Sequence, residues 1–162
     1  MRIMFVCHGN ICRSPMAEYI LGDMVKARGL EKEIQVSSCA TSTEEIWNGV
    51  GNDLYPPARR KLQEKGICAP KRQAVQLKKS DYTKYDLFVC MDANNVLNAL
   101  RILGADPEGK VCKLLSFAAD SADVADPWYT GDFERTYREV VRGCEALLAK
   151  WEKESKSSLP KR

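Results

Sequence analysis

The 162-residue chain has little of what marks non-globular or membrane proteins. It contains only 7 prolines and 10 glycines, which excludes a collagen-like or low-complexity chain. Its longest apolar stretches, such as Ile3 to Cys7 and Leu87 to Met91, have five residues. A helix that spans a membrane needs about 20. The sequence therefore predicts a soluble globular protein with no membrane segment and no membrane partner.

A secretory leader and a disulfide framework are also missing. The sequence begins with a strand-like segment, where a leader would carry basic, apolar and small-residue parts in turn. The seven cysteines have irregular spacings, and a chain of this length needs no covalent staples. We therefore expect free thiols and a cytoplasmic protein, with export by a leaderless route left open.

The length fits a single domain of about 150 residues. No repeat or linker interrupts residues 1–150, so we expect one domain over 1–151 and a polar, frayed tail over 152–162. The formal net charge is only +3, and no basic stripe is interleaved with aromatic residues. Nucleic acid is therefore not an expected partner, and a monomer is expected.

Strand-like and helix-like segments alternate along the chain. Runs rich in β-branched and apolar residues predict strands at 2–6, 34–38, 86–91 and 110–115. Apolar spacing and end signals predict helices at 15–28, 56–66, 93–104 and 133–151, the first of them capped by Ser14. This alternation favours an α/β fold, a three-layer sandwich with helices on both faces of a mostly parallel sheet. Ligands of such sheets bind beyond the carboxyl ends of the strands.

The segment between the first strand and the first helix carries a Cys-x5-Arg pattern. Residues 7–14 read Cys-His-Gly-Asn-Ile-Cys-Arg-Ser. A loop that leads into a helix directs several N–H groups at one point, where the helix dipole favours an anion. Gly9 and Asn10 permit a close turn, and Arg13 adds a planar fork for two phosphoryl oxygens. The loop is therefore predicted to bind phosphate.

Cys7 stands where the same field favours a thiolate, which is a nucleophile at neutral pH. Ser14 is placed to donate a hydrogen bond to its sulfur. The alternative is a buried strand-end thiol beside a surface arginine and a simple helix cap. A thiolate that transfers phosphate also needs an acid for the leaving oxygen. Asp126, stiffened by Pro127, is the candidate, although a plain turn fits that segment equally well.

Residues 7–15, Cys-His-Gly-Asn-Ile-Cys-Arg-Ser-Pro, and 126–129, Asp-Pro-Trp-Tyr, together resemble the low molecular weight protein tyrosine phosphatases. The resemblance extends over about residues 2–150. It implies a Rossmann-like, four-stranded parallel sheet flanked by helices, with no metal or other cofactor. It also implies a phosphotyrosine-containing protein or peptide as substrate and inorganic phosphate as product.

The same resemblance assigns a role to each matching residue. Cys7 would form a phosphocysteine, and Arg13 would bind the phosphoryl group. Asp126 would act as general acid and then as the base that activates water. The remaining loop residues would surround the phosphate: His8, Gly9, Asn10, Ile11, Cys12 and Ser14.

Two loop features follow from the resemblance. Asn10, Ser14 and Ser38 match a polar network that holds the loop in shape. The histidine that usually completes this network is missing, and Lys71 or Arg72 occupies its region. The second loop cysteine of the family can form a reversible disulfide with the nucleophile. Cys12 matches it, with a merely packed thiol as the alternative.

The pocket walls and the substrate preference are predicted from single positions. Trp128 and Tyr129 match aromatic positions of the acid loop. The aromatic residue of the opposite wall aligns near Glu44, so Trp47 is expected to replace it or to serve as a half-buried loop anchor. Related bacterial protein arginine phosphatases have threonine at the position of Ile11, so isoleucine favours phosphotyrosine.

Four rival functions are alternatives to a tyrosine phosphatase: a protein arginine phosphatase, an arsenate reductase, a noncatalytic phosphate-binding module and a metal site. Arsenate reductases of this fold relay electrons through two further, closely spaced cysteines, whereas Cys90 stands about twenty residues from Cys68 and Cys112. A binding module requires neither a thiol nor an acid. A metal site at 7–12 lacks a second pair of ligands at zinc-like spacing.

Overall fold

A parallel sheet with the strand order β2-β1-β5-β6 forms the middle layer of the protein, in a computed structural model that describes residues 1–158. All three strand pairings are parallel. The strands are β1 (Arg2–Cys7), β2 (Gln35–Ala40), β5 (Leu87–Cys90) and β6 (Val111–Lys113). The predicted four-stranded α/β fold is confirmed, and no predicted strand end is displaced by more than two residues.

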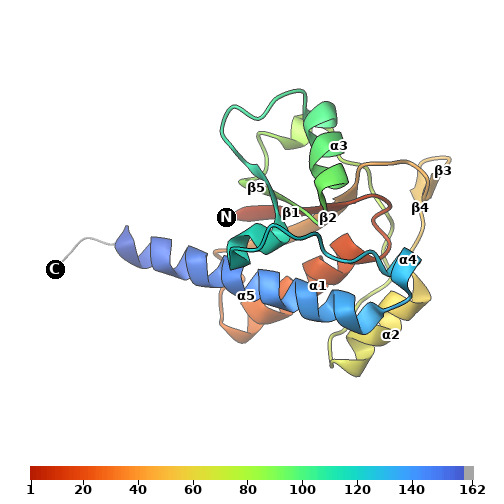
Figure 1. Cartoon of the computed structure of the whole chain (residues 1–162), viewed down its shortest axis with the longest axis horizontal. Coiled ribbons are helices and arrows are strands. Elements are labelled where there is room, and N and C mark those ends of the chain that lie inside the picture. Colours follow the sequence, from red (N-terminus) through yellow and green to blue (C-terminus); the bar gives the residue numbers. More distant parts are fainter. Residues whose placement is uncertain (159–162) are drawn as a thin grey trace.

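Helices cover both faces of this sheet, as Figure 1 shows. The helices α1 and α5 pack on one face and against each other, whereas α3 packs on the opposite face. The main helices are α1 (Arg13–Ala27), α2 (Pro56–Glu64), α3 (Ala93–Leu103) and α5 (Phe133–Ser157). Shorter helical turns are η1 (Lys79–Asp81), η2 (Leu114–Ala118) and α4 (Pro127–Thr130).

The strand β1 shows why the sheet is covered on both sides. Its alternate residues Ile3, Phe5 and Cys7 belong to the core formed with α1 and α5. The intervening Met4 and Val6 belong to the core beneath α3. A strand buried on both faces is apolar along its length rather than alternating, which explains the run Ile3 to Cys7. Cys7 therefore leaves the sheet at its carboxyl edge, on the α1 side.

The helix ends differ from the predictions by no more than two residues, except for the end of α5, and two of the differences change the role expected of a residue or segment. The helix α1 begins at Arg13, so Ser14 lies inside its first turn and is not the N-cap, a position that Cys12 takes. The helix α5 continues to Ser157, six residues beyond its predicted end at Trp151, so 152–157 are helical rather than frayed. Ser158 is the C-cap of this helix, and the rest of the predicted tail, 159–162, lies outside the described residues. No helix within 1–158 has the length and apolar character to cross a membrane.

A small β-hairpin was not predicted. The strands β3 (Ile46–Trp47) and β4 (Val50–Gly51) pair antiparallel across Asn48 and Gly49. Both turn residues have positive φ, 48° and 76°, as the tight two-residue turns of hairpins require. The dipeptide Asn-Gly between apolar residues is the signal that could have identified it.

Candidate active site

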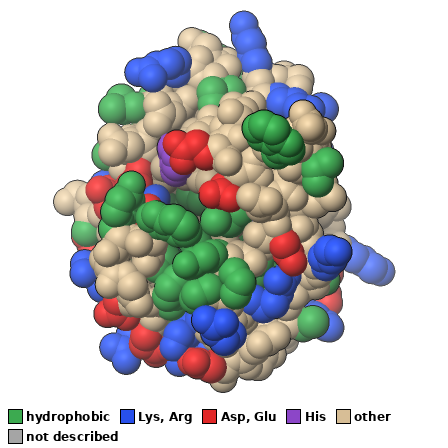
Figure 2. Space-filling model, turned by 90° about the vertical axis from the view of Figure 1, so that its right-hand side faces the viewer, with side chains coloured by type: hydrophobic (Ala, Val, Ile, Leu, Met, Phe, Trp, Pro, Cys, Tyr) green, Lys and Arg blue, Asp and Glu red, His purple; other side chains and the backbone are tan. Residues whose placement is uncertain are grey.

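A cleft of about 350 Å³ opens beyond the carboxyl end of β1, at the edge where the fold predicts a ligand site. Figure 2 shows a hollow on this face, with acidic, histidine and hydrophobic side chains at its border. The cleft brings the predicted loop and the predicted acid together. Its lining residues are Cys7, His8, Gly9, Asn10, Ile11, Cys12, Arg13, Glu44, Glu45, Asp126, Trp128 and Tyr129.

The phosphate loop, residues 7–13, wraps around the sulfur of Cys7. The Sγ atom lies 2.9 Å from Ser14 Oγ and accepts a hydrogen bond of 3.3 Å from the backbone N–H of Asn10. Asn10 has a φ of 60°, the left-handed conformation that asparagine tolerates better than most residues. No side chain within residues 1–158 caps the N-terminus of α1. The backbone N–H groups of Arg13 and Ser14 are therefore available to an anion in the loop, whereas Pro15 has no N–H and Met16 N already donates to the Cys12 carbonyl.

Arg13 is buried at the base of this loop, with 4% of its surface exposed. Its Nη1 donates to Asp92 Oδ2 at 2.8 Å and to the carbonyl of Val124 at 3.0 Å, and its Nη2 donates to Asp126 Oδ2 at 3.3 Å. Burial disfavours the charged guanidinium, but the negative charges of Cys7, Asp126 and Asp92 outweigh it and raise the pKa of Arg13. The guanidinium is therefore a fixed cation beside Cys7.

Asp92 is a further residue of the site that the sequence analysis did not identify. Besides holding Arg13, its Oδ1 accepts a 2.7 Å hydrogen bond from Asn95 N and so caps α3. The signal was an aspartate directly after a buried strand, at the carboxyl edge of a parallel sheet. The capping bond fixes the carboxylate, and the carboxylate in turn orients the arginine.

Asn10 is the centre of the predicted polar network. Its Nδ2 donates to Ser14 Oγ and to Ser38 Oγ, both at 2.9 Å. The expected basic residue is Arg72, which donates from Nη1 to the Asn10 carbonyl at 2.6 Å and from Nη2 to Asn10 Oδ1. Ser38 donates to the partly buried carboxyl of Glu18 at 2.6 Å, and desolvation raises the pKa of that carboxyl. Glu18 is thus a second participant that the sequence did not indicate.

The second loop cysteine lines the cleft as a buried thiol. Burial, followed by the nearby charge of Cys7, raises the pKa of Cys12 to about 12. Cys12 is therefore a neutral thiol at physiological pH, which separates its chemistry from that of the predicted nucleophile. All seven cysteines lie among the described residues and carry free thiols. Within residues 1–158, no three histidine, cysteine or acidic side chains converge as metal ligands do.

Asp126 both faces the cleft and builds one of its walls. Its Oδ1 accepts a hydrogen bond of 3.0 Å from Trp128 N and so caps α4, while its Oδ2 faces Arg13. Trp128 and Tyr129 stand on this turn and line the cleft as predicted. The ring of Trp128 lies 5.1 Å from that of Tyr55, which supports it from behind.

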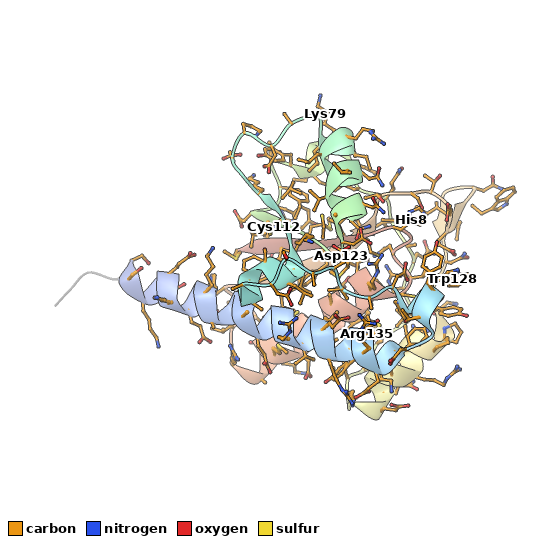
Figure 3. The ribbon with its side chains drawn as sticks, viewed as in Figure 1. His8, Lys79, Cys112, Asp123, Trp128 and Arg135 are labelled. Carbon is orange, nitrogen blue, oxygen red and sulfur yellow. The ribbon has the colours of Figure 1, made fainter. Side chains whose placement is uncertain are left out.

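The opposite wall is acidic rather than aromatic. Glu44 and Glu45 line it, and Glu44 Oε2 lies 2.9 Å from His8 Nε2. Figure 3 places His8 and Trp128 at the same end of the molecule. Trp47 lies on the β3–β4 hairpin with 80% of its surface exposed and does not line the cleft. It is neither the expected wall nor a half-buried anchor, because the tight hairpin turn carries it outward.

Comparisons with known proteins agree along almost the whole chain. Residues 2–157 match the family described as low molecular weight phosphotyrosine protein phosphatase. The low molecular weight protein-tyrosine-phosphatase YfkJ of Bacillus subtilis is 37% identical over 154 residues, which cover 94% of this chain and 96% of the relative. The crystal structure of YfkJ matches with a TM-score of 0.88 at 36% identity, over 95% of this chain and 96% of that one. The crystal structure of a Drosophila arginine phosphatase matches with a TM-score of 0.82 at 25% identity, over 93% and 98%.

Proposed function

The chain belongs to the low molecular weight phosphotyrosine protein phosphatase family, and on this premise we propose that it hydrolyses phosphotyrosine in proteins or peptides through a phosphocysteine intermediate. The observation that carries the proposal is the convergence of Cys7, Arg13 and Asp126 on one cleft. These residues supply a nucleophile, a fixed cation and a carboxyl group within the reach of one phosphate.

In the first step the Cys7 thiolate attacks phosphorus in line with the phenolic oxygen. An S–P bond forms as the P–O bond to tyrosine breaks. Ser14 Oγ and the Asn10 N–H stabilise negative charge on the sulfur, because a thiolate can only accept their hydrogens. Arg13 and the loop N–H groups meet the charge that spreads over the three equatorial oxygens.

Arg13 can exchange one partner without losing its orientation. Its Nη1 stays bound to Asp92 and to the Val124 carbonyl, while its Nη2 leaves Asp126 for a phosphoryl oxygen. Asp126 is then available, in its protonated form, to donate to the departing phenolate. In the second step the carboxylate takes a proton from water as the water oxygen attacks phosphorus. The S–P bond breaks, and inorganic phosphate leaves.

The cleft suits an aromatic leaving group. Trp128 and Tyr129 offer flat apolar surfaces for a phenyl ring, and Ile11 adds an aliphatic one. Ile11 is 91% buried and packs with Ala74, so it offers no polar group to a guanidinium. This favours phosphotyrosine over phosphoarginine, although an arginine phosphatase shares the fold.

The first experiment measures phosphate release, in the presence of EDTA, from matched peptides that carry phosphotyrosine, phosphoarginine or phosphoserine. We expect release from the phosphotyrosine peptide and its loss in Cys7→Ser, with oxyanion binding retained. Cys68→Ser, which changes an exposed thiol outside the cleft, is the matched control. Preference for phosphoarginine would keep the mechanism and overturn the substrate. Release by Cys7→Ser at the wild-type rate would overturn the nucleophile.

A second experiment tests the acid. General acid catalysis contributes about 10²–10⁴-fold, and most where the leaving group is poor. We expect Asp126→Ala to reduce kcat within that range for phenyl phosphate and much less for p-nitrophenyl phosphate. Equal losses for both substrates would place the acid elsewhere in the cleft.

A further inference from the structure

We propose that Arg72 is a positioning residue whose guanidinium holds the phosphate loop in its phosphate-binding shape through Asn10. The proposal rests on the function proposed above. It assigns a role in the reaction to a side chain that does not line the cleft. Three features of the structure carry it: the conformation of Asn10, the two hydrogen bonds that Arg72 donates to it, and the anchoring of Arg72 itself.

Asn10 is the residue of the loop 7–13 that has a positive φ, and it is fully buried. A non-glycine residue with positive φ persists only where its surroundings hold it there. Its amide nitrogen is used by Ser14 and Ser38, and its Oδ1 accepts from Val75 N at 3.1 Å as well as from Arg72. Its N–H meets the Cys7 sulfur. The shape of the loop around the nucleophile therefore depends on this one residue.

Arg72 donates hydrogen bonds to two oxygens of Asn10 at once. Nη1 donates to the main-chain carbonyl and Nη2 to the side-chain carbonyl, so a single planar group fixes both the peptide and the rotamer. The N–H groups of an imidazole diverge, so the histidine of the family pattern cannot donate hydrogen bonds to both oxygens in this way. Lys71, the other basic residue of the segment, is exposed. The geometry thus selects arginine.

The two hydrogen bonds from Arg72 determine where a neighbouring N–H group points. In a trans peptide the C=O and the following N–H point in opposite directions. Because the Asn10 carbonyl is held toward Arg72, the N–H of Ile11 turns away from Arg72. Ile11 lines the cleft, so this N–H is one that the loop can offer to a phosphoryl oxygen. Loss of these hydrogen bonds frees the peptide bond between Asn10 and Ile11 to rotate and weakens oxyanion binding.

Arg72 is itself anchored from α2. Its backbone N–H donates to Asp53 Oδ1 at 3.1 Å. Asp53 is held by both terminal nitrogens of Arg59 at 2.9 Å, a contact that, above all other causes, lowers the pKa of its carboxyl. Arg59 also donates to the carbonyls of Ala69 and Pro70 at 3.2 and 3.0 Å. The backbone that carries Arg72 is therefore fixed to a helix of the fold.

The test compares Arg72→Ala, Arg72→Lys and the control Lys71→Ala by two readouts: kcat, and competitive inhibition of p-nitrophenyl phosphate hydrolysis by inorganic phosphate. We expect Arg72→Ala to raise the inhibition constant for phosphate at least tenfold and to lower kcat. Arg72→Lys keeps a cation but not the fork, so an intermediate loss is expected. Lys71→Ala should match wild type within twofold.

Chemical rescue separates positioning from a general loss of structure. Added guanidinium chloride at 50 mM should restore part of the phosphate affinity of Arg72→Ala, whereas NaCl at equal ionic strength should not. If Arg72→Ala fails to fold, Arg72→Lys with an unchanged Tm carries the test, with at least a threefold loss of phosphate affinity expected. Wild-type phosphate affinity in a folded Arg72→Ala or in Arg72→Lys would overturn the proposal. An inactive wild-type protein would instead count against the proposed function.

Discussion

The replacement of Asn10 tests how firmly the phosphate loop is held. Its side chain makes four hydrogen bonds, to Ser14, Ser38, Arg72 and Val75. At about 1 kcal/mol for each bond, their loss in Asn10→Ala costs about 4 kcal/mol. Alanine also tolerates the φ of 60° poorly, which adds about 1 kcal/mol. Asn10→Gly loses the same bonds without that strain, so it should be the milder change by about 1 kcal/mol.

The assay is urea unfolding, monitored through tryptophan fluorescence, with m-values compared between variants. Asn94→Ala, at an exposed position of α3, is the control and should stay within about 0.5 kcal/mol of wild type. A loss of less than about 1 kcal/mol in Asn10→Ala would show that the network contributes little to stability. Equal losses for alanine and glycine would refute the argument from backbone strain.

Three further predictions concern other parts of the molecule. Hydrogen bonds from two lysines lower the pKa of Glu134 from 4.5 to about 2. The stability that this carboxylate contributes is therefore complete above pH 4.5 and lost as the pH falls toward 2, so the Tm of Glu134→Gln should lie below that of wild type at pH 6 and converge with it near pH 2. A Cβ at Gly143 would lie 2.4 Å from Leu114 Cγ, so Gly143→Ala should lower the free energy of unfolding by about 1–3 kcal/mol, and an unchanged urea midpoint would contradict this packing. Because its pKa is raised to about 12, Cys12 should stay unlabelled by iodoacetamide at pH 8 while Cys7 reacts, and peptide mass mapping that finds Cys12 labelled first would contradict this order.

The sequence predicted best what local patterns determine. The four strands, the four long helices and the loop between β1 and α1 follow from apolar spacing and end signals that lie within each segment. The first turn of α1 was misjudged because a good capping residue, Ser14, serves the loop network instead of the cap. The end of α5 was placed too early because its last turns are polar and lack the apolar stripe.

Partners distant in sequence were the harder part. Asp92 and Arg72 contact the loop directly and Glu18 contacts it through Ser38, and no local pattern records such contacts. The family resemblance indicated that Lys71 or Arg72 occupies the place of the missing histidine, but only the structure shows that Arg72 makes the contact. The exposure of Trp47 was not anticipated because the hairpin turn at Asn48 and Gly49 was not predicted.

The placement of β1 between β2 and β5 bears on how the protein is synthesised. The ribosome makes Cys7 early, but its strand gains its first neighbour, β2, only after Ala40 and its second, β5, only after Cys90 has emerged. Asp126 and the covering helix α5 follow later still. A nascent chain thus holds the Cys7 thiol long before it holds Asp126, the proposed acid, and folding from the first residue onward cannot produce turnover. Phosphatase activity would therefore report translation past Asp126, whereas alkylation of the thiol would not.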